Sequence, residues 1–363
     1  MTDAFGGYGG IAQYNRDLLT SLAQGPGVTS TDVIVRLAPD DLQVLPAKVR
    51  QGPAVRGRIA YALAALIKAL QTRPQIIICG HIYHGPLAQL IASLTGAKLV
   101  SQLHGTEIWQ QVSPTHLKPL DGSERVLCVS RHTKGCFDRQ SQLDQPNSIV
   151  VSNTVGPQFT PGDKQFARAK FGIGKEKVIL TVARLDTREG YKGHDRIIAE
   201  LGRLNATQAN GVLYLIAGQG PDLSRLEALA EQLEVANKVR YMGKVPVEDL
   251  PDLYRAADLF ALPSTGEGFG IVYLEAMACG TPAIGLRIGG VPDALADGEL
   301  GLCVEPAEFP EALASAIQSS PVDRQALSNA VHSRFGREAF AKRVLGVLTT
   351  LNSSKKKSPH NDD

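Results

Sequence analysis

Residues 259–282 read LFALPSTGEGFGIVYLEAMACGTP. The first four residues are apolar and predict a buried strand, a loop with three glycines follows, and residues 270–279 have the composition of a helix. A strand that leads through a glycine-rich turn into a helix is the repeating unit of a parallel α/β sheet. Ligands bind at the carboxyl ends of such strands, so Glu267 in the loop and Glu275 on the helix are candidate binding residues.

Apolar runs of strand length alternate with segments of helical period along the rest of the chain. This alternation predicts parallel sheets covered by helices on both faces. The non-periodic residues 153–164, rich in glycine and proline, divide the pattern into two doubly wound α/β units. The predicted strands are 33–37, 75–80, 98–103, 126–129, 149–151, 178–183, 212–217, 239–242, 259–262, 283–286 and 302–304. The predicted helices include 11–22, 194–204, 223–233, 247–257, 270–279, 311–319 and 338–351.

The composition is that of an ordinary globular protein, with 363 residues, 43% hydrophobic and 20% charged. The net charge of +2 excludes a strongly basic nucleic-acid-binding protein. No apolar stretch approaches the roughly 20 residues of a membrane-spanning helix, and the first residues lack a secretory signal. The five cysteines form no C-x-x-C pair, which predicts reduced thiols and no zinc site. We therefore expect a cytoplasmic protein.

Basic residues are concentrated in the first half of the chain. Residues 42–106 contain seven Lys or Arg and no Asp or Glu. Within 56–70, apolar residues recur at helical spacing with basic residues beside them: Ile59, Leu63, Leu66, Ile67 and Leu70, with Arg56, Arg58 and Lys68. A basic amphipathic helix suits the surface of an anionic membrane. A helix packed on its own sheet has the same pattern, so both interpretations remain open.

Glu267 and Glu275 are eight residues apart, which places them about two helical turns from each other. The glycines of the loop allow backbone N–H groups to approach a ligand, and the helix N-terminus adds partial positive charge suited to phosphate. Two carboxylates at different depths could bind hydroxyls at two places on a long ligand, such as a sugar and a ribose. The alternative is a simple turn followed by an amphipathic helix with one solvated glutamate.

Arg184 directly follows a predicted strand, and Lys192 lies in the same loop. Two cations at the carboxyl end of a strand suit a diphosphate, because Arg offers a bidentate fork and Lys a point charge. The alternative is a surface loop in which Asp186 and Glu189 form salt bridges with these cations.

The remaining signals are weaker. Gly10 ends a glycine-rich loop before a predicted helix, and such loops can bind anions. His104 directly follows a predicted strand, where it could contact a substrate or simply be an ordinary polar residue. His81 and His84 have no third ligand nearby, so no metal site is predicted.

The motifs in order are Gly9-Gly10-Ile11-Ala12, His104-Gly105-Thr106-Glu107, Cys128-Val129-Ser130, Asn153, Thr181-Val182-Ala183-Arg184-Leu185, Lys192-Gly193, Ala217-Gly218-Gln219-Gly220 and the Glu-x7-Glu segment from Glu267 to Glu275. Along nearly its whole length the chain resembles the retaining glycosyltransferases of family 4. Their GT-B fold has two doubly wound Rossmann-like domains facing each other across a cleft. The resemblance implies an acceptor-side domain over 1–155, a nucleotide-sugar-binding domain over 156–335, a helix crossing back over 336–352 and a disordered tail over 353–363.

The resemblance implies a role for each candidate residue. Glu267 would bind hydroxyls of the donor sugar, and Glu275 would hold the nucleotide ribose. Arg184 and Lys192 would neutralise the leaving diphosphate, so that neither a metal nor a cofactor is needed. His104 would lie near the transferred sugar. Backbone groups would contact the donor at Gly10, Gly268, Phe269, Gly270, Ile271 and Val272.

The implied function is transfer of a hexose, with mannose as one choice, from a nucleotide-sugar to a glycan or lipid-linked acceptor. The setting would be bacterial polysaccharide or glycoconjugate synthesis, with peripheral attachment at an anionic inner membrane and no nucleic-acid partner. Two other functions remain open, a nucleotide-sugar epimerase of the same fold and a non-catalytic module that binds a nucleotide-sugar.

The sequence departs from the family at two places. Residues 1–5 are too short and too polar for the strand that precedes the glycine loop in the family. We therefore expect either a start further upstream or a first sheet that lacks a central strand. The loop between Arg184 and Lys192 is also long, which makes Arg188 a competing phosphate ligand.

Overall fold

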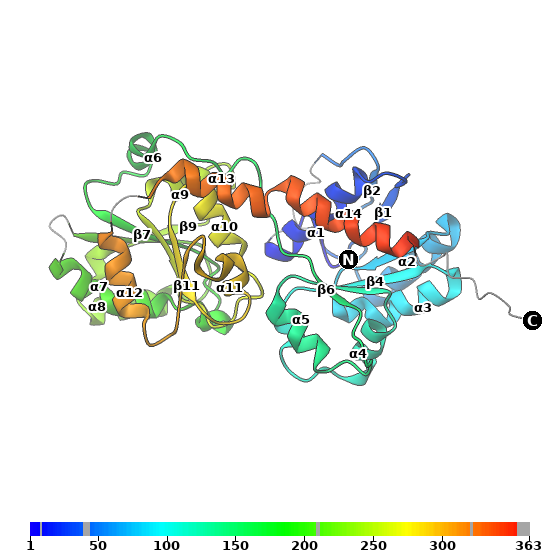
Figure 1. Cartoon of the computed structure of the whole chain (residues 1–363). Coiled ribbons are helices and arrows are strands. Elements are labelled where there is room, and N and C mark those ends of the chain that lie inside the picture. The colour runs from blue at the N-terminus through cyan, green and yellow to red at the C-terminus, as the bar shows by residue number, and fades with distance from the viewer. Residues whose placement is uncertain (8, 39–43, 208–210, 320–321, 354–363) are drawn as a thin grey trace, which may run out of the picture. The chain divides into compact units, whose positions relative to one another are not determined.

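The computed structural model describes residues 1–7, 9–38, 44–207, 211–319 and 322–353. The chain divides into two compact α/β units (Figure 1). Unit 1 comprises Met1–Thr154 and the described part of Arg337–Asp363, and unit 2 comprises Val155–Gly336. The predicted tail lies outside the described residues from residue 354 onward.

Unit 2 contains one six-stranded parallel sheet in the order β12-β11-β10-β7-β8-β9. Numbered along the unit, this order is 6-5-4-1-2-3, which is that of a doubly wound Rossmann fold. The strands are β7 (Lys177–Val182), β8 (Val212–Ala217), β9 (Val239–Gly243), β10 (Leu259–Leu262), β11 (Ala283–Leu286) and β12 (Leu302–Val304). The helices are α6 (Lys164–Lys170), η3 (Thr187–Lys192), α7 (His194–Thr207), α8 (Leu223–Gln232), η4 (Ala236–Lys238), α9 (Leu250–Ala256), α10 (Ile271–Ala278), α11 (Val291–Ala294), η5 (Ala296–Gly298), α12 (Phe309–Gln318) and α13 (Arg324–Phe335).

The winding of this sheet reverses between β7 and β10. Strand β7 pairs with β8 on one side, from Lys177↔Val212 to Val182↔Ala217, and with β10 on the other. In an open parallel sheet the ligand crevice lies outside the carboxyl ends of the strands at this reversal. A ligand-binding site is therefore expected in the loops that follow β7 and β10.

A buried chain of hydrogen bonds ties the centre of this sheet together. The His194 ring lies 3.0 Å from the Tyr214 hydroxyl, which donates to Thr181 Oγ1 at 2.9 Å, and Thr181 in turn donates to the Ala261 carbonyl at 2.5 Å. Burial lowers the pKa of His194 to about 4, so this ring is neutral at physiological pH. The network links β7, β8 and β10 to the start of α7.

Unit 1 contains two parallel sheets, a pair β1-β2 and a four-stranded sheet β3-β4-β5-β6. The strands are β1 (Thr31–Val33), β2 (Val49–Gln51), β3 (Ile76–Cys79), β4 (Lys98–Leu103), β5 (Arg125–Cys128) and β6 (Ser148–Val150). The helices are α1 (Gly10–Ala23), α2 (Arg58–Thr72), η1 (Ile82–His84), α3 (Gly85–Thr95), η2 (Thr106–Ile108), α4 (Pro114–Asp121), α5 (Arg131–Asp138) and α14 (Arg337–Ser353). Helix α14 packs on α1, with the rings of Phe340 and Tyr14 5.7 Å apart.

The first residues lie between the two sheets of unit 1. The Met1 ammonium donates to the Ile34 carbonyl at 2.9 Å, and the Thr2 carbonyl accepts from the N–H groups of Arg36 and Leu37. The Met1 side chain lies against Gly80, directly after β3. Burial lowers the pKa of the Met1 ammonium to about 6. Residues 1–5 form no strand, and the strand predicted over 33–37 is wrong beyond Val33.

The other predicted strands are present within one or two residues at each end, so the prediction of two doubly wound α/β units is confirmed. The helix predicted over 247–257 begins later, at Leu250. Strand β2 and helix α13 were not predicted. The five cysteines are free and buried, as expected of core thiols.

Candidate functional site

Loops from several strands of unit 2 converge at the carboxyl edge of its sheet. The Thr265 N–H, after β10, donates to the Tyr191 carbonyl in the loop after β7 at 2.9 Å. The Gly290 N–H, after β11, donates to the Glu267 carbonyl at 2.8 Å. These bonds hold the glycine-rich loop between its two neighbours.

Two glycines make this close approach of the loops possible. Gly193 has a φ of +77°, and a Cβ there would lie 2.5 Å from the Pro263 carbonyl oxygen. A Cβ on Gly290 would lie 2.0 Å from the Gly268 carbonyl oxygen. Any side chain at either position would push the loops apart, because both close neighbours are backbone atoms.

Lys192 and Glu267 form an ion pair at the reversal point of the sheet. Lys192 Nζ lies 2.5 Å from Glu267 Oε1, and the two side chains are 15% and 11% exposed. Burial disfavours the charge of Lys192, but the Glu267 carboxylate outweighs burial and holds the pKa of the ammonium above its ordinary value. Among the described residues, no group donates to the second carboxylate oxygen of Glu267. That oxygen could accept a ligand hydroxyl.

Arg184 and Arg188 also form ion pairs in this loop. Arg184 pairs with Glu189, and its side chain is 68% exposed. Arg188 makes a bidentate pair with Asp186 at 3.0 and 2.7 Å. These pairs use the acidic partners expected for a salt-bridged surface loop. Whether either arginine binds a phosphate remains a prediction.

Several charged side chains influence the hydroxyl of Tyr191. Burial raises the pKa of its hydroxyl, which Lys192 and Arg184 lower and Glu189 and Glu267 raise further. Four charged side chains therefore act on one half-buried ring. Lys192 and Glu267 are in direct contact, whereas Arg184 pairs with Glu189 in the same loop.

Glu275 lies on the second turn of α10, and the hydroxyl of Tyr254 on α9 donates to its Oε2 at 2.7 Å. Tyr254 is fully buried, and burial together with Glu275 holds the pKa of its hydroxyl well above the ordinary value. Tyr254 therefore orients the carboxylate. This contact could not be predicted from the sequence, because the two residues belong to different helices.

The backbone donors predicted from the resemblance lie at the start of α10. The first N–H groups of a helix have no intrahelical partner, so those near Gly268, Gly270, Ile271 and Val272 suit an anionic ligand. The Phe269 ring is 2% exposed and packs edge-on against Phe335, with ring centroids 5.9 Å apart. The buried ring therefore anchors the loop.

Gly10 and His104 belong to unit 1. Gly10 is exposed at the first position of α1. His104 follows β4, and its Nε2 lies 3.0 Å from the Gly80 carbonyl oxygen, while its backbone N–H donates to Glu107. Their predicted contacts with the donor stay predictions.

Aromatic rings surround His104 in unit 1. The rings of Tyr14 and His81 lie 5.4 and 6.3 Å from it, and Tyr83 stacks on His81 at 4.9 Å. Burial lowers the pKa of His84 to about 4. Among the residues that the structure describes, no group of three or more His, Cys, Asp or Glu side chains is arranged to hold a metal ion.

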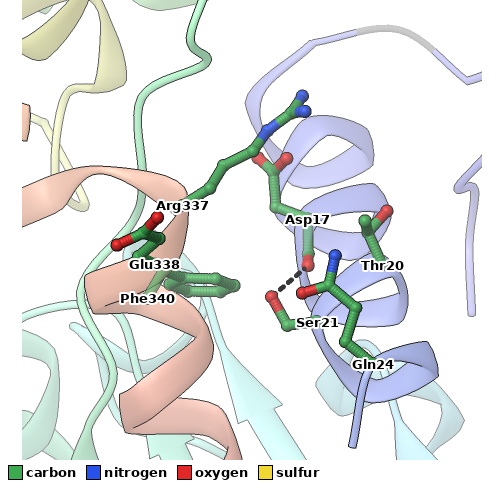
Figure 2. A pocket seen from close by; sticks show the side chains of 7 residues that line it. All are labelled: Asp17, Thr20, Ser21, Gln24, Arg337, Glu338 and Phe340. Atoms are coloured by element: carbon green, nitrogen blue, oxygen red, sulfur yellow. Dashed lines mark hydrogen bonds between the residues drawn. The ribbon is translucent and has the colours of Figure 1, made fainter.

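Unit 1 also has a cavity of about 260 Å³ between α1 and α14 (Figure 2). None of the predicted site residues lines it. Burial raises the pKa of Asp17 to about 6, against the hydrogen bond from Gln13 and the nearby charge of Arg337. The lining residues are Asp17, Thr20, Ser21, Gln24, Arg337, Glu338 and Phe340.

The chain is similar to glycosyltransferases of known sequence. Residues 163–332, within unit 2, match the model of the family described as glycosyl transferases group 1. The chain is 35% identical over 292 residues to the D-inositol 3-phosphate glycosyltransferase of Segniliparus rotundus, covering 74% of this chain and 64% of that protein. It is 33% identical over 238 residues to the GDP-mannose-dependent alpha-(1-6)-phosphatidylinositol monomannoside mannosyltransferase of Mycolicibacterium smegmatis, covering 61% of each. The matches therefore span less than two thirds of either relative.

A solved structure shows the same fold over nearly the whole chain. The sucrose-phosphate synthase of Thermosynechococcus elongatus superposes with a TM-score of 0.75 at 22% identity, covering 95% of this chain and 94% of that one. The parallel sheets of both units and the Rossmann strand order of unit 2 agree with this similarity. The chain therefore belongs to the glycosyl transferases group 1 family, and its two Rossmann-like units are those of the GT-B fold.

Proposed function

We propose that the chain is a metal-independent, retaining hexosyltransferase of the family 4 type that takes mannose from GDP-mannose. The Lys192–Glu267 pair carries this proposal, because it places a cation and a carboxylate side by side at the reversal point of the sheet. The cation suits a diphosphate and the carboxylate suits sugar hydroxyls. The mycobacterial relative, named as GDP-mannose-dependent, supports the choice of donor.

The proposed acceptor carries an inositol phosphate, linked to lipid. Two observations support this class, since one relative is named for phosphatidylinositol monomannoside and the other for inositol 3-phosphate. An acceptor hydroxyl would attack the anomeric carbon from the face that the diphosphate leaves. The bond from that carbon to the phosphate oxygen would break, and the acceptor proton would pass to the leaving oxygen. Configuration at the anomeric carbon would be kept.

The protein would act mainly through electrostatics in this reaction. Lys192 and Arg184 would stabilise the negative charge that develops on the diphosphate, while Glu267 would hold the sugar. Glu275, oriented by Tyr254, would hold the ribose. An epimerase and a non-catalytic binding module would need the same donor contacts, but the relatives named above are transferases.

A ligand screen followed by product analysis tests the proposal. GDP-mannose at 100 times its Kd should stabilise the chain by about 2.7 kcal/mol, and UDP-glucose or ADP-glucose at the same concentration should stabilise it less. Turnover with an inositol phosphate acceptor should release GDP, and addition of EDTA should change the rate little. An epimerised donor, or binding without any glycoside product, would contradict the proposal.

A further inference from the structure

His194 follows Lys192 by two residues and begins helix α7. The residue is 5% exposed, so its ring belongs to the interior of unit 2. Gly193, between the two, lies close to the Pro263 carbonyl and leaves no room for a side chain. Successive Cα atoms are about 3.8 Å apart, so the position of the His194 backbone limits where Lys192 can lie.

The buried hydrogen bonds of the sheet fix the position of the proton on the His194 ring. The Ala261 carbonyl can only accept, so the Thr181 hydroxyl donates to it. Thr181 has then used its single hydroxyl proton, and the Tyr214 hydroxyl must donate to Thr181. The Tyr214 oxygen therefore accepts from the ring, which requires the proton of the neutral His194 ring to lie on Nδ1.

The other ring nitrogen, His194 Nε2, is then unprotonated. It is buried and has no hydrogen-bond partner among the residues that the structure describes. A second proton on the ring would find no acceptor there, which agrees with the pKa of about 4 that burial gives this ring. Within the described part of the chain, the ring is therefore held by its single hydrogen bond to Tyr214.

These hydrogen bonds run from α7 to the strand that leads into the loop of Glu267. Tyr214 lies on β8, Thr181 on β7 and Ala261 on β10. Strand β10 continues directly into the glycine-rich loop. The same bonds therefore fix the backbone beside Lys192 relative to the backbone that carries Glu267.

From these contacts we propose that His194 is a positioning residue for the donor diphosphate. Its hydrogen bond to Tyr214 would hold Lys192 against Glu267, where the ammonium would meet the phosphates. His194 would act through Lys192 and would not touch the donor. The part that concerns the diphosphate rests on the proposed function, whereas the hold on the ion pair needs no ligand.

Calorimetric titration with GDP and with guanosine tests this role. Tyr214→Phe and His194→Gln each remove the hydrogen bond, so GDP should bind about fivefold more weakly while guanosine affinity stays unchanged. His194→Asn should bind GDP within about twofold of the wild type, because its amide can donate from near the position of Nδ1. Lys192→Met/Tyr214→Phe should bind GDP no more weakly than Lys192→Met, because the network acts through Lys192.

Tyr241→Phe is a matched control on the same face of the sheet. Tyr241 of β9 lies opposite Ile216 of β8, which is two residues after Tyr214 and so shares its face. The Tyr241 hydroxyl is buried and has no hydrogen-bond partner in the part of the chain that the structure describes. Tyr241→Phe therefore removes the same atom without a hydrogen bond, and GDP affinity should stay within about twofold of the wild type.

Urea unfolding without ligand separates this inference from the proposed function. The coupling between Lys192→Met and Glu267→Gln should be about fivefold smaller, as a factor in the unfolding equilibrium constant, when Tyr214→Phe is also present. This change in coupling, together with no GDP binding by the wild type, would reject the proposed function alone.

Three results would overturn the inference. They are an unchanged coupling of the ion pair in Tyr214→Phe, equal losses of GDP and guanosine affinity in that variant, and additive losses of GDP affinity in Lys192→Met/Tyr214→Phe. Each would leave the network with a role in the stability of the sheet and none in the placement of Lys192.

Discussion

Loss of either partner of the Lys192–Glu267 pair should lower the stability of unit 2, whereas only loss of Lys192 should weaken the binding of GDP. The ammonium and carboxylate are 2.5 Å apart and mostly buried, so removal of either partner leaves a charge without its counter-ion. Lys192→Met and Glu267→Gln should each destabilise unit 2 by about 3 kcal/mol, the lower end for a buried pair, because both side chains retain some solvent contact. The double variant should lose much less than the sum.

Ligand binding should separate the two partners. Lys192→Met should weaken GDP binding by about 1.5–3 kcal/mol, the cost of a charged hydrogen bond. Glu267→Gln leaves the ammonium free for phosphate, so GDP affinity should stay the same or rise. Turnover of the donor should nevertheless fall sharply in Glu267→Gln, because the proposed contact with the sugar is lost.

Urea unfolding and calorimetric titration with GDP provide the measurements. Far-UV circular dichroism follows both units, whereas the single tryptophan, Trp109, lies in unit 1 and should report an unchanged transition. Lys170→Met is a matched control, since this lysine pairs with Asp249 and Asp252 at the surface of unit 2 and should matter little to either assay. Additive losses in the double variant would contradict a coupled ion pair, and full GDP affinity in Lys192→Met would contradict a phosphate contact of Lys192.

Three further predictions concern single side chains. Tyr254→Phe removes the hydroxyl that orients Glu275, so the KM for the donor should rise about fivefold or more while kcat stays close to wild type; a fall in kcat alone would exclude a ribose-holding role. Arg184→Ala should weaken GDP binding far more than guanosine binding and Arg188→Ala should not, and the reverse result would identify Arg188 as the phosphate ligand. Asp17→Asn should stabilise unit 1 by up to about 3 kcal/mol at pH 8. Burial raises the pKa of the Asp17 carboxyl to about 6, so its ionisation lowers the free energy of unfolding as the pH rises from about 4 through 6. The gain should fall to about 1 kcal/mol near pH 4.5 when unfolding is followed by tryptophan fluorescence, and a gain independent of pH would contradict the assigned cause.

Continuous apolar runs made the central strands predictable from sequence. Strand β8 has the predicted bounds, because a strand buried on both faces is apolar at most positions. Strand β2 has only three residues, two of them polar, and it exists through its pairing with β1. Helix α13 was not predicted because it has few buried residues and therefore no clear apolar period. Its buried residues include Ser328, Val331 and Phe335.

Local motifs located the candidate site, but contacts between distant residues completed it. The loop glycines and Glu267 stand out in the sequence, whereas the partner of Glu267 lies 75 positions away. The contact from Tyr254 to Glu275 likewise depends on how α9 packs beside α10. The sequence also could not predict which side of α2 faces solvent, since its apolar period fits a helix that turns its apolar side either inward or outward. Only the fold shows that Ile59 and Leu63 face solvent.

The proposed reaction transfers a sugar with retention from a nucleotide donor bound at the carboxyl edge of unit 2. Its most direct test is an NMR analysis of the product formed from donor labelled with ¹³C at the anomeric carbon, with GDP-mannose and an inositol phosphate acceptor. Transfer with retention should yield a new glycoside with the anomeric configuration of the donor, formed by the wild type and almost absent with Glu267→Gln. A product of inverted configuration, or equal product from Glu267→Gln, would contradict it.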